Sequence, residues 1–133
     1  MENNKEDFVD YGLAGMLKNL GFNFGTAYYY DAFSKEHQIC YSSTLSNHNC
    51  FNDEASAPTL YLAQKWLREE KNIVVEVWCN AIGYNWDVAK TNVTFIQDFE
   101  KCNNSNDGGM FDDYESALMN ALKYTCKYLQ KQK

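Results

Sequence analysis

The feature that most constrains the fold is an alternating stretch near the middle of the chain. Apolar residues occupy every second position of this stretch, with Glu76 among the residues between them: Ile73, Val75, Val77 and Cys79. Successive side chains of a strand point to opposite faces, so this period of two predicts a β-strand with one wholly apolar face. Such a face must pack against another layer, and we expect amphipathic helices to supply that layer.

Two segments that precede this strand have apolar residues at helical spacing. The first covers residues 6–20 and ends directly before Gly21, the residue type that a left-handed helix cap favours. The second begins near Ser56, which we predict to be the N-cap, and Pro58 is expected in its first turn. We expect this helix to end at Asn72, immediately before the alternating strand.

A third helix is predicted near the end of the chain. Asp112 and Glu115 have the spacing of a capping box, with Asp112 in the role of the capping residue. The apolar stripe that follows has helical spacing and runs from Tyr114 to Leu129.

Four further segments are rich in aromatic and β-branched residues and are predicted to be strands: 26–33, 38–42, 84–90 and 93–99. The polar stretches 43–56 and 101–109 are expected to be loops. The resulting element order is α-β-β-α-β-β-β-α. Short connections favour antiparallel neighbours, so we predict an α+β fold with an antiparallel sheet and helices packed mainly on one face.

Size and charge narrow the class of protein. The chain has 133 residues, which suits a single domain covering 1–133. Eighteen acidic residues against 12 basic ones give a net charge of −6, and binding to nucleic acid depends mainly on Lys and Arg. We therefore expect no direct nucleic-acid binding. We also expect no membrane helix, since no apolar run of about 18 residues occurs.

The cysteines and the first residues indicate the cellular compartment in which the protein is expected. Five cysteines occur without a C-x-x-C pair: Cys40, Cys50, Cys79, Cys102 and Cys126. An odd number with no regular spacing argues against a disulfide framework and favours a reducing compartment. The first residues are polar and lack the pattern of a secretory signal, so we expect a cytoplasmic location.

The sharpest candidate for chemistry is a set of four residues that includes both histidines: His37, Cys40, His48 and Cys50. Zinc prefers four such ligands, and a cysteine beside a histidine can also act as a nucleophile. His37 and Cys40, however, would point to opposite faces of a regular strand, and no surrounding catalytic signature is present. We predict no metal, no cofactor and no enzyme activity. The alternative is a small Cys/His-based enzyme or zinc-binding protein that uses these four residues.

The aromatic residues suggest a binding surface. If helices cover only one face of the sheet, the other face presents a set of apolar side chains: Tyr28, Tyr30, Val74, Trp78 and Ile96. Tyrosine and tryptophan dominate the energetics of many interfaces, and an open apolar face of this kind is unusual in a monomer. The alternative is that these residues belong to the core or are covered by the 43–56 loop.

Two segments carry a resemblance to a known group of proteins. Residues 57–73 contain A-P-T-L-x-x-A-x-K-W-L-R-E, and residues 111–118 contain Y-E-x-A-L. In this respect the chain resembles small proteins encoded by bacterial phages and other mobile elements, often in gut bacteria. The resemblance covers about residues 57–129. It implies a phage or prophage context and a bacterial host cell, but no activity or functional residue comes with it.

These observations predict a non-enzymatic protein-interaction module. It would act on a protein partner, for example as an acidic inhibitor of a nucleic-acid-binding host factor, or it would self-associate. A third possibility is a small ligand held between the sheet and the 43–56 loop.

Overall fold

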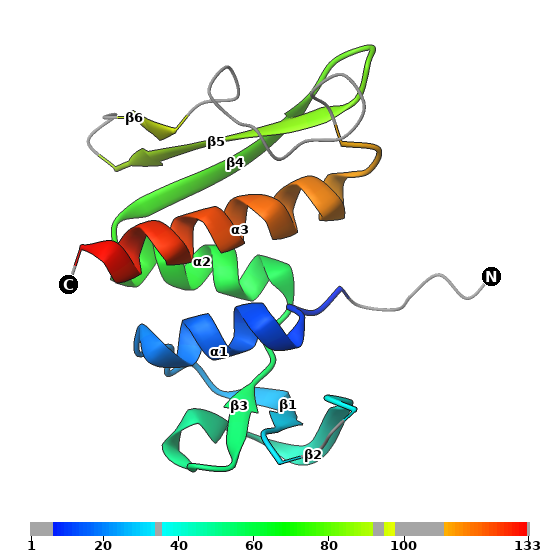
Figure 1. Cartoon of the computed structure of the whole chain (residues 1–133), viewed down its shortest axis with the longest axis vertical. Coiled ribbons are helices and arrows are strands. Elements are labelled where there is room, and N and C mark those ends of the chain that lie inside the picture. Colours follow the sequence, from blue (N-terminus) through cyan, green and yellow to red (C-terminus); the bar gives the residue numbers. More distant parts are fainter. Residues whose placement is uncertain (1–6, 34–35, 92–94, 98–110, 133) are drawn as a thin grey trace.

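The computed structural model describes residues 7–33, 36–91, 95–97 and 111–132. It places three helices as an inner layer between two antiparallel sheets (Figure 1). The helices are α1 (Tyr11–Asn19), α2 (Leu60–Glu70) and α3 (Tyr114–Lys131). One sheet has the order β2-β1-β3, built from β1 (Thr26–Asp31), β2 (Ile39–Ser46) and β3 (Glu54–Ser56). The other has the order β4-β5-β6, built from β4 (Ile73–Cys79), β5 (Tyr84–Lys90) and β6 (Phe95–Gln97).

The predicted α+β class and antiparallel pairing are confirmed, and the observed order differs from the predicted one by the short helix η1 and the additional strand β3 before α2. The strands nevertheless form two sheets rather than one. Each sheet has helices on its inner side, so the expectation that helices cover one face holds for each sheet separately (Figure 1). The sequence prediction placed all strands in one sheet because strand patterns show which face is buried but not which strands are neighbours.

The sheet β4-β5-β6 contains the alternating strand, whose predicted bounds are confirmed. Val75 is only 2% exposed, and it pairs with Val88 of β5, which is fully buried. Trp86, also fully buried, pairs with Val77. These side chains form the inner face of the sheet, and β4 and β5 both pack against α3. The apolar side of the alternation therefore meets the helices as predicted.

The sheet β2-β1-β3 packs beneath α1 (Figure 1). Tyr30 lies at its centre, paired with Ile39 on one side and Ala55 on the other. Its side chain is buried, and its hydroxyl donates a hydrogen bond of 2.7 Å to the carbonyl oxygen of Val9. This bond ties the middle strand to the segment that leads into α1.

Helix α1 begins later than predicted but ends as expected. Asp10 is its N-cap and accepts a hydrogen bond from the Leu13 N–H at 2.9 Å. Residues 7–9 are extended rather than helical, and the Val9 N–H donates to the Pro58 carbonyl at 3.0 Å. Gly21 has a φ of 96°, and the Phe22 N–H reaches back to the Leu17 carbonyl at 3.0 Å. This is the Schellman arrangement, for which glycine is the favoured residue.

Helix α2 is capped by Thr59, whose hydroxyl accepts a hydrogen bond from the Leu62 N–H at 3.1 Å. The prediction that Ser56 caps this helix is wrong, because Ser56 is the last residue of β3. Pro58 lies just before the helix rather than in its first turn. Its carbonyl instead pairs with the extended N-terminal segment.

The segment predicted as a loop, 43–56, contains regular structure. Strand β2 continues to Ser46, a short 3₁₀ helix (η1) covers His48–Cys50, and β3 covers the last three residues. Strand β1 ends at Asp31 rather than Phe33. The register between β1 and β2 shifts between Thr26 and Tyr28, which marks a bulge. Strand β3 is too short to show a period of two, and the bulge interrupts the period between β1 and β2.

Helix α3 contributes a long buried stripe to the core. Ala117, Leu118, Ala121, Leu122 and Cys126 are fully buried and belong to one continuous core cluster with residues from all three helices and both sheets. Although α3 spans 18 residues, no helix among the described residues is long and apolar enough to cross a membrane. The predicted loop 101–109 and the ends of the predicted strand 93–99 lie outside the described residues.

The cap of α3 gives a test of the fold. The structure makes Asp113 the N-cap, since its carboxylate accepts a hydrogen bond from the Ser116 N–H at 2.7 Å, whereas Asp112 was predicted. We expect Asp113→Ala to lower the free energy of unfolding by about 1 kcal/mol, the usual contribution of an N-cap. Urea denaturation followed by circular dichroism measures this difference.

Asp112→Ala is the matched control, because it removes an exposed acid one residue away. We expect it to change stability by less than about 0.5 kcal/mol. A larger loss for Asp112→Ala than for Asp113→Ala would contradict the assigned cap.

Candidate functional site

The four Cys/His candidates lie in different surroundings. His37 is exposed, has a φ of 49°, and stacks on the ring of Tyr11 with centroids 3.7 Å apart. Cys40 is half-buried in β2, while Cys50 is exposed at the end of η1. Within the described part of the chain, no group of three or more His, Cys, Asp or Glu side chains is placed to hold a metal ion.

His48 is buried, with both ring nitrogens engaged. Its Nδ1 lies 2.7 Å from Oε1 of Glu54, and its Nε2 lies 3.1 Å from the Thr26 carbonyl oxygen. Its ring also stacks on Tyr29, with centroids 4.5 Å apart. Both partners are oxygen atoms, and the Ser46 hydroxyl lies a further 3.4 Å from the same Nε2. His48 therefore fastens η1 to the outer face of β1 and has no free nitrogen for a ligand or a nucleophile.

The cysteines are free thiols wherever the structure describes them, which are Cys40, Cys50, Cys79 and Cys126. Cys102 lies outside the described residues. Burial raises the pKa of the Cys126 thiol from 9.0 to about 12, because the interior of the core disfavours the thiolate. Cys126 is thus a small apolar core residue.

The predicted aromatic patch is divided between the two sheets. Tyr28 and Tyr30 belong to β1, whereas Val74 and Trp78 belong to β4, on the far side of the helical layer (Figure 1). Ile96 lies in β6, and its side chain is outside what the structure describes. These residues therefore do not form one surface.

Trp78 and Val74 lie on the outer face of the β4-β5-β6 sheet, and both are half-buried. The Trp78 indole N–H donates to Oδ2 of Asp87 at 3.2 Å. Asn85, which pairs with Trp78 across the sheet, is fully buried. This side of the sheet is consequently not an open apolar face.

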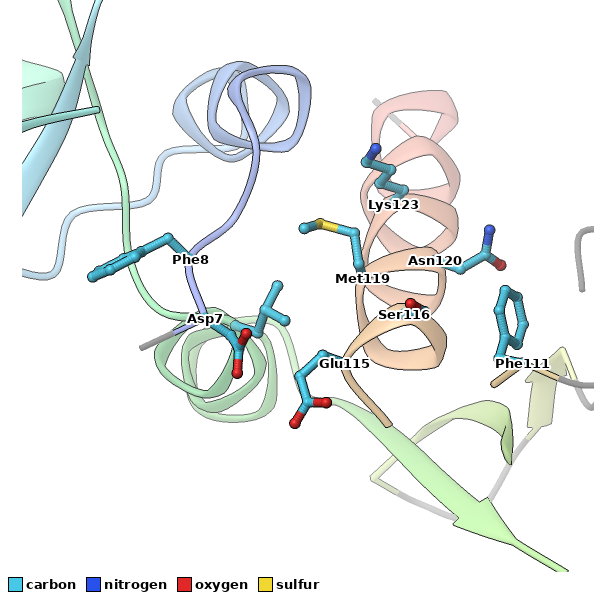
Figure 2. Close-up of a pocket in the computed structure, with 9 residues that line it drawn as sticks. Asp7, Phe8, Phe111, Glu115, Ser116, Met119, Asn120 and Lys123 are labelled. Atoms are coloured by element: carbon cyan, nitrogen blue, oxygen red, sulfur yellow. The ribbon is translucent and has the colours of Figure 1, made fainter. Parts of the chain in front are cut away.

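A cavity of about 350 Å³ lies between the N-terminal segment and α3 (Figure 2). Its walls are formed by Asp7, Phe8, Leu60, Phe111, Glu115, Ser116, Met119, Asn120 and Lys123. Figure 2 shows Met119 and Glu115 projecting from α3 toward the side of Phe8 and Asp7, and Asn120 on the side of Phe111.

Three polar side chains of this cavity, those of Glu115, Asn120 and Lys123, are partnered within the protein. Lys123 Nζ lies 2.6 Å from Oδ2 of Asp10, and the Asn120 side-chain oxygen accepts from the Trp86 indole N–H at 3.1 Å. The Tyr61 hydroxyl donates to Glu115 at 3.0 Å, and burial together with this carboxylate raises the pKa of Tyr61 to about 12. These bonds join elements of the fold, which favours a structural role for the cavity walls over ligand binding.

Strand β2 forms one edge of its sheet and carries exposed apolar side chains. None of its eight residues, Ile39 to Ser46, is charged or proline. Tyr41 is 64% exposed and Leu45 is 75% exposed. Two ring contacts extend this surface inward, with centroids 5.1 Å apart for Tyr41–Tyr28 and 4.6 Å apart for Tyr28–Phe8. We call this set the β2-edge surface: Phe8, Tyr28, Ile39, Tyr41 and Leu45.

Sequence reasoning found only Tyr28 of this surface. The strand was predicted to end at residue 42, so Leu45 was assigned to a loop. The sequence does carry one sign of this surface: residues 39–46 have no charge in a chain with 18 acidic residues.

No family model, no curated protein and no solved structure matches this chain.

The His48 contacts lead to a stability prediction. Glu54→Ala leaves a buried imidazole nitrogen without its acceptor, and we expect a loss of about 1–3 kcal/mol in the free energy of unfolding. Asp53→Ala, at the exposed neighbouring position, is the control and should change stability by less than about 0.5 kcal/mol. Chemical denaturation of both variants measures the effect, and equal stabilities would show that the His48–Glu54 contact does not hold η1.

Thiol reactivity gives a second prediction. We expect a maleimide at neutral pH to label Cys50 and Cys79 rapidly, since both are exposed. Cys126 should react only on unfolding, because its raised pKa lowers the thiolate fraction roughly a thousandfold. Peptide mapping by mass spectrometry follows each site separately. Labelling of Cys126 as fast as Cys50 in the folded protein would contradict the assigned burial.

Proposed function

We propose that this protein is a non-enzymatic protein-interaction module that binds through its β2-edge surface. The observation that carries the proposal is an eight-residue edge strand without charge or proline, with Tyr41 and Leu45 largely exposed. The backbone groups along a free edge can pair with a strand from another chain, and neighbouring side chains then give specificity.

The other edge strands support this assignment by contrast. Edge strands of stable proteins are usually short, charged, bulged or covered, because an open edge pairs with other chains. Strand β3 has only three residues. The β4 edge is covered in part, since the Gln64 side chain donates to the Val75 carbonyl at 2.7 Å. The first residues of β2 lack these protections, and this is typical of an edge that is used.

The net charge indicates the kind of partner, and the resemblance to phage proteins indicates the kind of cell. A net charge of −6 favours association with basic surfaces and disfavours nucleic acid itself. The resemblance to proteins of phages and mobile elements suggests a bacterial host cell, and free cysteines are typical of its cytoplasm. We therefore propose an acidic accessory protein or inhibitor that acts through a protein partner.

Affinity capture with variants of the edge tests this function. Tyr41→Lys adds a charge at the exposed centre of the β2-edge surface, and we expect it to reduce recovery of bound proteins from host lysate about tenfold or more. Recovery is quantified by mass spectrometry against the wild-type protein.

Ile82→Lys is the matched control, because Ile82 is also an exposed apolar residue, 76% accessible, and lies in the β4–β5 turn. It should retain the same bound proteins as the wild type. The proposal fails if no protein is enriched, or if Tyr41→Lys and Ile82→Lys have the same effect while both remain folded.

A further inference from the structure

The backbone of β2 presents two pairs of outward hydrogen-bonding groups. The Tyr28 carbonyl accepts from the Ala57 N–H, and the Ala32 N–H donates to the Asp53 carbonyl, both at 2.9 Å. The even-numbered residues of β1 thus face β3, and Tyr29 between them faces β2. Tyr29 pairs with Cys40, so Cys40 directs its backbone groups toward β1.

It follows that the N–H and C=O groups of Ile39 and Tyr41 point away from the sheet. No hydrogen bond to these four groups is formed within the part of the chain that the structure describes. Their spacing is two residues, with Cys40 at the midpoint. An antiparallel strand with the same spacing can pair with all four groups.

A second copy of β2 has this spacing. With a two-fold axis at Cys40, Ile39 lies opposite Tyr41 of the second copy, and Tyr41 lies opposite its Ile39. All four outward groups of each copy are then satisfied, and the interface is self-complementary. The side chains of Ile39 and Tyr41 meet across the axis as an aromatic–aliphatic pair, a favourable cross-strand combination.

The charge of the chain does not oppose a second copy at this particular strand. Each molecule carries a net charge of −6, so most approaches between two copies bring acidic residues together. Strand β2 has no charged residue, which lets two copies meet there without like charges in direct opposition. The exposed side chains on this strand are apolar or hydroxylic.

We propose that two copies of this protein pair through their β2 strands about a two-fold axis at Cys40, forming one six-stranded sheet. This inference rests on the proposed function, since it names the occupant of the same surface. The continuous sheet has the order β3-β1-β2-β2-β1-β3. The paired segment is short because His37, with its positive φ, ends the extended backbone on one side. So small an interface predicts a dissociation constant on the order of 10–100 µM.

The position of Cys40 makes the pairing testable by cross-linking. Residues of an antiparallel pair that do not exchange hydrogen bonds have Cα atoms about 4.5 Å apart. This separation lies within the range that a disulfide spans, about 4.4–6.8 Å. We expect diamide to link two copies of the wild-type protein through Cys40 at concentrations near the dissociation constant. Non-reducing electrophoresis and peptide mapping identify the bond.

Two cysteine variants define the cross-link. Cys40→Ser should abolish it, and Cys50→Ser, which removes an exposed thiol outside the strand, should leave it unchanged. A cross-link that survives Cys40→Ser would overturn the proposed register.

Ile39→Pro tests the hydrogen bonds themselves. Proline is tolerated as the first residue of a strand, and at position 39 it removes an N–H that faces outward in the monomer. We expect sedimentation equilibrium over about 1 µM to 1 mM to show a dissociation constant raised tenfold or more. Ile39→Val, which keeps the N–H and most of the side chain, should dimerise like the wild type.

A wild-type protein that stays monomeric over the whole range would overturn the inference. The proposed function would then still be judged by the capture experiment, where Tyr41→Lys reports loss of a different partner. If the capture experiment also fails, the inferred dimer and the proposed function are both wrong.

Discussion

The structure depends on the burial of α3 between other elements. Leu118, Leu122 and Cys126 have no exposed surface, and α3 packs against β4 and β5 on one side and α1 on the other. A three-stranded sheet needs a partner layer to be stable in water. The chain builds two such sheets from 133 residues, and the shared helical layer lets one core serve both.

Polar contacts fix how the second sheet is attached to this layer. The two carboxylate oxygens of Asp10 have separate roles, because one caps α1 through Leu13 and the other pairs with Lys123 of α3. One residue earlier, Val9 binds Pro58 through its N–H and Tyr30 through its carbonyl. The start of α1 is thereby joined to α3, to the entry of α2 and to the middle strand β1. Strand β2 receives none of these bonds, which leaves it as the outer edge.

The sequence predicted the elements better than it predicted their neighbours. The bounds of β4 and β5 were correct because a strand buried on one face alternates clearly, as Val75 and Glu76 show. Strand β3 was missed because three residues cannot show a period, and its position is fixed by pairing with a strand distant in sequence, as Ala55 pairs with Tyr30 of β1. Asp112 and Asp113 are both suitable caps, and only the backbone geometry distinguishes them.

The candidate site was predicted less well for a related reason. Tyr30 and Trp78 were placed on one surface because the strand pattern does not say which sheet a strand joins. His48 looked like a ligand beside Cys50, but its role comes from Glu54 and Thr26, which no spacing rule connects to it. Edge position is likewise a property of topology, so the openness of Tyr41 was visible only in the folded chain.

An open edge carries a risk of unlimited strand addition, and the fold limits that risk. The bulge between Thr26 and Tyr28 disrupts the register of β2, so its regular, open part is confined to the residues around Cys40. The opposite edge of the same sheet is β3, which is too short to extend a ladder. Pairing of two β2 strands consumes both open edges and leaves two β3 edges outside. A two-fold interface of this kind closes at the dimer, whereas a head-to-tail interface would continue into a fibre.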